Sequence, residues 1–212
     1  MIRGLPYDAE VEYLESTGTQ YFDTVVVNTD SVTWSGTIRQ TDSSKACFGF
    51  GYRFVTAATY VGNMRWLFIY PDRRIGLRNG SYAENSTSEV PASTPFRISY
   101  DGTTVYVDSV PFVTCTARST TSNYGVAYLL GINTTGYYNA DLSPSVGRIY
   151  DFTISDNSTL VRDFIPVRVG QVGYMYDRVT RKLFGNSGTG SFIVGPDVAT
   201  PVMGIHEYPE QN

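Results

Sequence analysis

The sequence is poor in the side chains on which most enzymes and metal sites depend. Its 212 residues include one histidine, His206, and two cysteines, Cys47 and Cys115. A single histidine near the end of the chain leaves no Ser-His-Asp set, no Cys-His set and no histidine-based zinc site in the rest of it. Two cysteines far apart in sequence do not make a structural zinc site either. We expect both to be buried free thiols, because no secretion signal supports an oxidising compartment, and a disulfide between them is the alternative.

Charge is also scarce. Charged residues make up 17% of the chain, the net charge is −4 at pH 7 and the pI is near 5.0. Nucleic-acid-binding domains carry a basic face, so this balance argues against nucleic acid as a partner. No apolar stretch approaches the length of a membrane-spanning helix, and the first fifteen residues contain no apolar run. We therefore expect neither membrane insertion nor a signal peptide.

Aromatic residues and period-two alternation dominate what remains. The 17 tyrosines and 11 phenylalanines favour strands. Apolar side chains occupy every second position in residues 48–54, 96–100 and 150–154, where Tyr150, Phe152 and Ile154 are expected to share a face. Short strands separated by turn residues at regular spacing predict an all-β, two-sheet antiparallel sandwich.

Two dipeptides predict tight hairpins within this pattern. Asn79-Gly80 and Asp101-Gly102 each lie between strand-like runs. Asn-Gly and Asp-Gly supply the positive φ angles of a type I′ turn, whose twist matches that of the flanking strands.

The stretch YLESTGTQYFDT, residues 13–24, mixes carboxylates with aromatics around a break at residues 17–19. We expect it to form a strand pair. Glu12, Glu15 and Asp23 raise the question of a glycosidase, whose retaining form needs two carboxylates about 5 Å apart on one face. Glu10 and Glu12 share the parity of one strand face, but Glu15 does not, so we expect no catalysis here.

Four stretches resemble a known superfamily. Residues 94–112, TPFRISYDGTTVYVDSVPF, are similar to the central hairpin of laminin-G-like domains, and residues 129–164 are similar to that family's later strands. Both belong to the concanavalin-A-like lectin/glucanase superfamily. Residues 11–24 and 161–197 resemble a branch of it found in gut bacteria and their phages.

The resemblance implies a jelly roll of two antiparallel sheets with adjacent first and last strands. We divide the chain into an N-terminal arm at residues 1–9, a concanavalin-A-like sandwich at residues 10–197 and an extended C-terminal tail at residues 198–212. The last stretch of the chain, GPDVATPVMGIHEYPEQN, contains three prolines and no alternation of apolar and polar residues. It is therefore expected to be extended and suits docking on a partner or another copy.

Sugar binding needs aromatic faces for stacking and short polar side chains for hydroxyl groups. The candidate residues are Asn133, Tyr137, Tyr138 and Asn139 in one loop, and Trp66, Tyr70 and Arg73 along a possible groove. Core packing is the alternative role for Trp66. An oligomer contact is the alternative for the two loop tyrosines, because tyrosine is equally suited to protein interfaces.

The resemblance also implies a possible calcium site, because many relatives bind calcium in loops at the rim of the sandwich. Asp141 and Asn139, beside Asn133, offer suitable oxygens. The alternative is ordinary Asx-turn capping in the same loop.

The functional hypothesis is a non-enzymatic phage virion protein, a fibre or capsid decoration, that attaches to host or mucosal glycans. Such a protein is made in the host cytoplasm and carried on the virion beside other virion proteins. A homo-oligomer, with a trimer favoured, would offset weak single-site affinity. The alternatives are a purely structural capsid or tail assembly protein and a carbohydrate-binding module of a bacterial surface protein.

Overall fold

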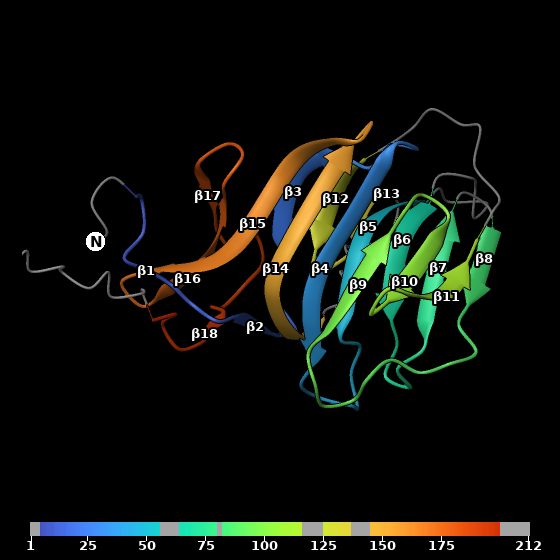
Figure 1. The fold of residues 1–212 in the computed structure, drawn as a ribbon, viewed down its shortest axis with the longest axis horizontal. Helices are drawn as coiled ribbons and strands as arrows, with labels where there is room; N and C mark the ends of the chain where they lie inside the picture. The colour runs from blue at the N-terminus through green and yellow to red at the C-terminus, as the bar shows by residue number, and fades with distance from the viewer. Residues whose placement is uncertain (1–4, 56–63, 80–81, 116–124, 137–144, 200–212) are drawn as a thin grey trace, which may run out of the picture.

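The computed structural model describes residues 5–55, 64–79, 82–115, 125–136 and 145–199. All regular secondary structure in these ranges is β-strand, and the strands form two sheets packed face to face (Figure 1). The predicted all-β sandwich is confirmed. Pairing between strands is antiparallel apart from β13 with β5. The described residues contain no helix long and apolar enough to cross a membrane.

The larger sheet has eleven strands in the described residues, with the path β11-β10-β9-β4-β14-β15-β16-β17, while β1 pairs with β15 and β2 pairs with β14 and β18. Its strands are β1 (Ala9–Glu10), β2 (Leu14–Thr17), β4 (Val32–Gln40), β9 (Phe96–Tyr100), β10 (Thr104–Val107), β11 (Val110–Thr114), β14 (Val146–Asp156), β15 (Thr159–Val169), β16 (Val172–Asp177), β17 (Lys182–Phe184) and β18 (Ile193–Val194).

The smaller sheet follows the path β3-β12-β5-β6-β7-β8, with β13 added to β5. Its strands are β3 (Phe22–Val27), β5 (Phe48–Val55), β6 (Met64–Ile69), β7 (Ile75–Asn79), β8 (Tyr82–Asn85), β12 (Val126–Leu129) and β13 (Asn133–Gly136). β3 is an edge strand of this sheet.

Aromatic rings from both sheets meet in the core. Trp34 on β4 lies 5.2 Å from Phe50 and 5.6 Å from Phe152, measured between ring centroids. Phe48, Phe50 and Tyr52 are all buried, as the alternation in residues 48–54 predicts. Burying a phenylalanine side chain stabilises the fold by roughly 1.5–3 kcal/mol, so this cluster is a main source of stability. Cys47 and Cys115 are also buried in the core.

The expected alternation in residues 150–154 is wrong at its first position. The pairing of β14 with β4 shifts register between Ile149 and Asp151, which is a β-bulge. Ile149, Phe152 and Ile154 are fully buried, whereas Tyr150 is partly exposed beside Tyr13. The extra residue of the bulge therefore removes Tyr150 from the core face.

The expected strand pair in residues 13–24 is also wrong. β2 belongs to the larger sheet and β3 to the smaller one, so the intervening turn carries the chain between sheets. The Gln20 side chain holds this turn, because its Oε1 accepts a hydrogen bond from the Thr17 N–H at 2.8 Å. Gly18 has a φ of 111°, which suits glycine. The last strand, β18, pairs with β2, whereas the first strand, β1, pairs with β15.

The hairpins predicted at the two glycine dipeptides form, but one turn differs. β9 and β10 are paired, yet only Gly102 of the Asp101-Gly102 dipeptide has a positive φ, of 106°. A type I′ turn needs both, so this turn is of another kind. The Asp101 carboxylate stabilises it by accepting hydrogen bonds from the Thr103 and Thr104 N–H groups. β7 pairs with β8, but Gly80 lies outside the described residues.

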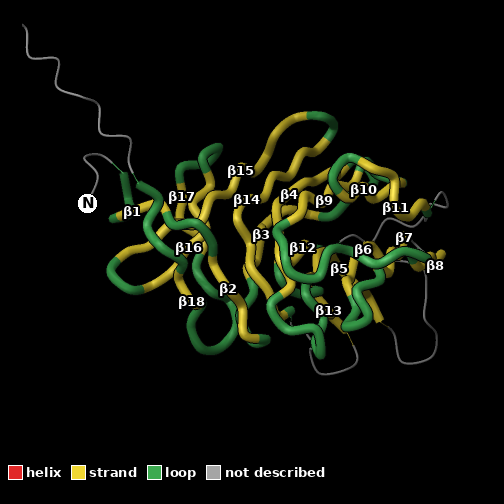
Figure 2. Tube along the Cα trace, turned by 60° about the horizontal axis from the view of Figure 1, so that its bottom comes forward, coloured by secondary structure: helices red, strands yellow, loops and turns green. Residues whose placement is uncertain are grey.

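The N-terminal segment packs on one end of the larger sheet. Leu5 and Tyr7 contact a small apolar cluster that includes Val167 and Tyr176, on β15 and β16. The Tyr7 and Tyr176 rings lie 5.0 Å apart. This end, with β1, β2, β16, β17 and β18, lies opposite the end that carries β7, β8 and β11 (Figure 1 and Figure 2).

Candidate functional site

Trp66 and Tyr70 lie on the outer face of the smaller sheet. They pack with Ala46, Phe68 and Ile132 in a cluster separate from the main core. Tyr70 lies over Gly76, where a Cβ atom would approach within 2.6 Å of its ring. The structure thus brings these two predicted aromatic residues to one face, with Phe68 between them.

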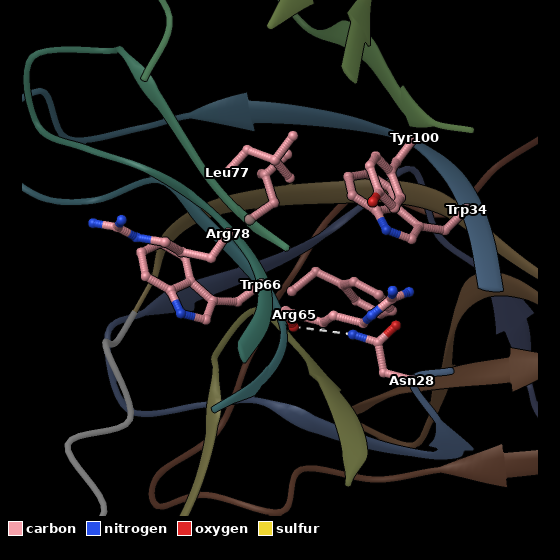
Figure 3. Close-up of a pocket in the computed structure, with 9 residues that line it drawn as sticks. Asn28, Trp34, Arg65, Trp66, Leu77, Arg78 and Tyr100 are labelled. Carbon is pink, nitrogen blue, oxygen red and sulfur yellow. Dashed lines mark hydrogen bonds between the residues drawn. The ribbon is translucent and has the colours of Figure 1, made fainter. Parts of the chain in front are cut away.

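A small cavity lies beside Trp66. Figure 3 shows Arg78 alongside the Trp66 ring, and the guanidinium carbon is 5.6 Å from the ring centroid. The cavity next to them measures about 10 Å³ and is bounded by Arg65, whose Nη1 donates to the Thr29 carbonyl at 2.7 Å. Such a volume holds about one water molecule.

Arg73 and Asn133 have structural partners. Arg73 forms an ion pair with Glu89 and has a positive φ, of 63°. Asn133 is 6% exposed, and its amide donates a hydrogen bond to the Val126 carbonyl at 2.8 Å. Asn133 therefore stabilises the connection from β12 to β13.

The remaining predicted residues lie outside the described ranges. These are Tyr137, Tyr138, Asn139 and Asp141. Their roles in sugar and calcium binding stay predictions. Within the described ranges, no three His, Cys, Asp or Glu side chains gather in a way suited to a metal ion.

A larger groove, of about 370 Å³, lies at the edge of the smaller sheet. We call it the Tyr21 groove. It is formed by the turn between β2 and β3, the end of β12 and the glycine-rich loop after β17. Its lining residues are Gly18, Thr19, Gln20, Tyr21, Leu130, Ser187, Gly188 and Thr189. The sequence identified residues 17–19 and 185–190 as separate turns, and nothing local in either indicated that they meet.

Backbone hydrogen bonds hold the two turns together. The Thr189 N–H donates to the Thr19 carbonyl at 3.1 Å, and the Ser187 N–H donates to the Tyr21 carbonyl at 2.9 Å. Asn186 adds a side-chain contact, because its Oδ1 accepts from the Tyr21 N–H. The loop therefore covers part of the free edge next to β3 and gives the groove a fixed wall.

Tyr21 supplies an aromatic surface in the groove. Its ring stacks on Tyr128, with 4.7 Å between centroids and 25° between planes, and both residues are partly exposed. Burial raises the pKa of the Tyr128 hydroxyl, and the neighbouring Tyr21 and Asp23 raise it further. Tyr128 therefore stays a neutral hydrogen-bond donor over a wider pH range.

The lining residues suit a neutral, hydroxyl-rich ligand. Thr19, Ser187 and Thr189 are exposed and carry hydroxyl groups, while no lining residue is charged. Leu130 forms an apolar part of the wall and has a positive φ, of 63°. For a non-glycine residue this conformation is uncommon, and such strain is concentrated at functional sites.

The carboxylates of the first strands are committed elsewhere. Arg148 donates to Glu15 at 2.7 Å, and the Asp23 carboxylate accepts from the Val25 N–H at 2.8 Å. Glu12 is exposed, and none of the three lines the Tyr21 groove. Among the described residues, no carboxylate lines the groove.

Comparisons with known proteins show similarity at the level of fold. No protein-family model matches the chain, and no curated protein matches it. Among solved structures, a crystal structure from Bacteroides ovatus described as a "putative carbohydrate binding protein" is similar, with a TM-score of 0.57 and 13% sequence identity. The match covers 90% of this chain and 61% of the other, so this chain spans about three fifths of that protein's length.

Proposed function

We propose that this protein binds neutral glycans in the Tyr21 groove. The observation that carries the proposal is the combination of a partly exposed tyrosine ring with the hydroxyl groups of Thr19, Ser187 and Thr189 in one preformed groove of about 370 Å³. Sugar rings have an apolar face that packs on an aromatic ring and a periphery of hydroxyl groups that bind short polar side chains.

The wider hypothesis is a non-enzymatic attachment protein of a phage virion. An uncharged groove without an acid and base pair supports binding rather than hydrolysis. One aromatic contact contributes about 1 kcal/mol, so single-site affinity is low and display on a homo-oligomer, with a trimer favoured, compensates.

A carbohydrate-binding module of a bacterial surface protein is the second candidate. Three properties of the Bacteroides ovatus structure favour it. That protein is bacterial and is described as carbohydrate-binding, and the matched region is 61% of its chain. Both candidates use the same groove. They differ in whether the domain belongs to a phage virion or to a bacterial surface protein.

The test is glycan-array binding of the purified chain, followed by affinity measurement on the glycans that bind. Tyr21→Ala is expected to lose about tenfold or more in affinity, because the stacking surface is removed. Tyr106→Ala is the matched control, because Tyr106 is a partly exposed tyrosine on β10 and does not line the groove.

A second variant decides between the two tyrosine sites. Tyr137→Ala with Tyr138→Ala tests the loop predicted from the sequence. Loss of binding in this double variant, with Tyr21→Ala unaffected, would move the site to that loop and refute the groove. Incubation of the bound oligosaccharide with the protein is expected to release no new reducing ends, and their appearance would contradict the non-enzymatic proposal.

A further inference from the structure

Two arginines face each other on the open face of the larger sheet. Arg39 on β4 and Arg148 on β14 are direct partners in the antiparallel register. Ile38 precedes Arg39, Ile149 follows Arg148, and both isoleucines are buried in the core. Because neighbouring residues of a strand face opposite sides, the two arginines point away from the core. Like charges directly opposite on neighbouring strands destabilise a sheet unless other groups neutralise them.

Arg148 is neutralised by its neighbours. Its Nε donates to the Glu15 carboxylate at 2.7 Å, from the adjacent strand β2. Its guanidinium carbon lies 3.9 Å from the centroid of the Tyr13 ring, which is a close cation–π contact. Arg148 therefore has both an ion pair and an aromatic surface.

Arg39 has no such partner. Its Nε is buried and makes no hydrogen bond, and the described residues offer it no ion pair within 4.0 Å. The neighbouring carboxylate, Asp151, pairs instead with Arg97 at 3.3 Å. A buried donor without an acceptor destabilises the folded protein, and the effect is larger when the group is charged.

Arg39 therefore differs from the two neighbouring arginines, Arg97 and Arg148. Glu15 pairs with Arg148 and Asp151 pairs with Arg97, so Arg39 is the one of these three arginines without an ion pair among the described residues. This occurs on a protein whose net charge is −4. An unsatisfied buried polar group in a folded protein calls for an explanation, and a bound ligand is one.

We propose that Arg39 and Arg148 form a second ligand site, which binds the carboxylate of an acidic saccharide such as a uronic acid. A guanidinium group matches a carboxylate through two parallel N–H donors. The carboxylate of the ligand accepts hydrogen bonds from the Arg39 guanidinium group.

The surroundings of the pair favour a saccharide over a small free anion. The Tyr13 and Tyr150 rings lie 5.7 Å apart beside Arg148, and both are partly exposed. Thr37, two residues before Arg39 on the same face of β4, adds a partly exposed hydroxyl group. The site goes beyond the Tyr21 groove, whose lining carries no charge, and does not depend on it.

Titration of the unmodified protein tests the site directly. The probes are tri-galacturonate, neutral galactotriose as its uncharged counterpart, and sodium sulfate, followed by NMR of the arginine Nε–H groups. Tri-galacturonate is expected to shift the Arg39 Nε–H resonance, and galactotriose is expected to leave it unmoved. An equal response to sulfate would indicate a site for anions in general and overturn the saccharide proposal.

Variants provide the second measurement. Arg39→Gln is expected to weaken tri-galacturonate binding by about tenfold or more, whereas Arg97→Gln removes the same charge from the same face and leaves binding unchanged. The melting temperature of Arg39→Gln is expected to equal or exceed that of the unmodified protein, because an unpartnered charge is removed. A lower melting temperature would show that Arg39 has a structural role and refute the proposal.

The two proposed sites are separable in the same experiments. Tyr21→Ala is expected to lose neutral glycans and retain tri-galacturonate. If Arg39→Gln leaves tri-galacturonate binding intact, the acidic site is refuted while the Tyr21 groove stands. If Tyr21→Ala abolishes binding of both probes, they share the groove and the second site is refuted.

Discussion

Gly188 lies so close to Thr19 that a Cβ atom at position 188 would be 2.0 Å from the Thr19 carbonyl oxygen. The same atom would be 3.0 Å from Cδ1 of Tyr21. The contact at 2.0 Å is with backbone, which cannot rotate away as a side chain does. The absence of a side chain at residue 188 therefore allows the glycine-rich loop to form a wall of the Tyr21 groove.

Gly188→Ala is expected to displace this loop and abolish glycan binding in the groove. Gly185→Ala is the matched control, since the closest atom to its added Cβ would be Cε1 of Tyr174, at 3.3 Å on a side chain. Affinity for an array-identified glycan is the measurement. Unchanged affinity in Gly188→Ala would mean that the loop does not contribute to the site.

Asp177 is the most deeply buried carboxylate in the described residues, and we expect Asp177→Ala to be strongly destabilising. It is fully buried and accepts hydrogen bonds from the Asp163 N–H at 2.8 Å and the Thr180 hydroxyl at 2.6 Å. Arg162 lies 3.8 Å away. Its removal leaves buried donors and a cation without their acceptor, which costs about 3–5 kcal/mol.

Urea unfolding of Asp177→Ala measures this cost, with Asp197→Ala as the control. Asp197 forms an ion pair with Arg168 at 2.6 Å, but its side chain is 49% exposed. Exposed ion pairs contribute little to stability, so the control should unfold close to the unmodified protein. Equal destabilisation by both substitutions would contradict the role assigned to burial.

Tyr7 is expected to make the protein less stable at high pH. Burial raises the pKa of its hydroxyl from 10.0 to about 12, and a hydrogen bond to Glu10 at 3.0 Å contributes. The unfolded chain releases this proton near pH 10, whereas the folded chain keeps it to about pH 12. The stabilisation is therefore complete below pH 10 and is lost as the pH rises from 10 towards 12.

Urea unfolding across this range, with Tyr7→Phe as the comparison, checks the prediction. The unmodified protein is expected to lose more free energy of unfolding above pH 10 than Tyr7→Phe, which has no proton to release. Parallel pH profiles for the two proteins would show that another group causes the alkaline loss.

Local patterns in the sequence were sufficient to predict the class of fold. Alternation places successive side chains on opposite faces of a strand, so residues 48–52 and 96–98 could be assigned a core face from their order alone. The pattern failed at Tyr150, because a bulge depends on the pairing between strands and leaves no mark in the alternation.

The candidate site was only partly accessible from the sequence. Trp66 and Tyr70 were identified as aromatic candidates, and the structure places both in one outer cluster. The Tyr21 groove was missed, although its turns were recognised. Thr19 and Thr189 are hydrogen-bonded partners 170 positions apart, and no local signal connects them.

The sequence by itself determined the strands, most of their buried faces and the class of sandwich, because side-chain alternation and turn chemistry act over a few residues. Only the tertiary structure decided that β2 and β3 enter different sheets, that the loop at residues 186–189 reaches β3, and that Arg39 faces Arg148. These relationships arise when distant strands pair, since the free energy of burying a shared core fixes which segments become neighbours.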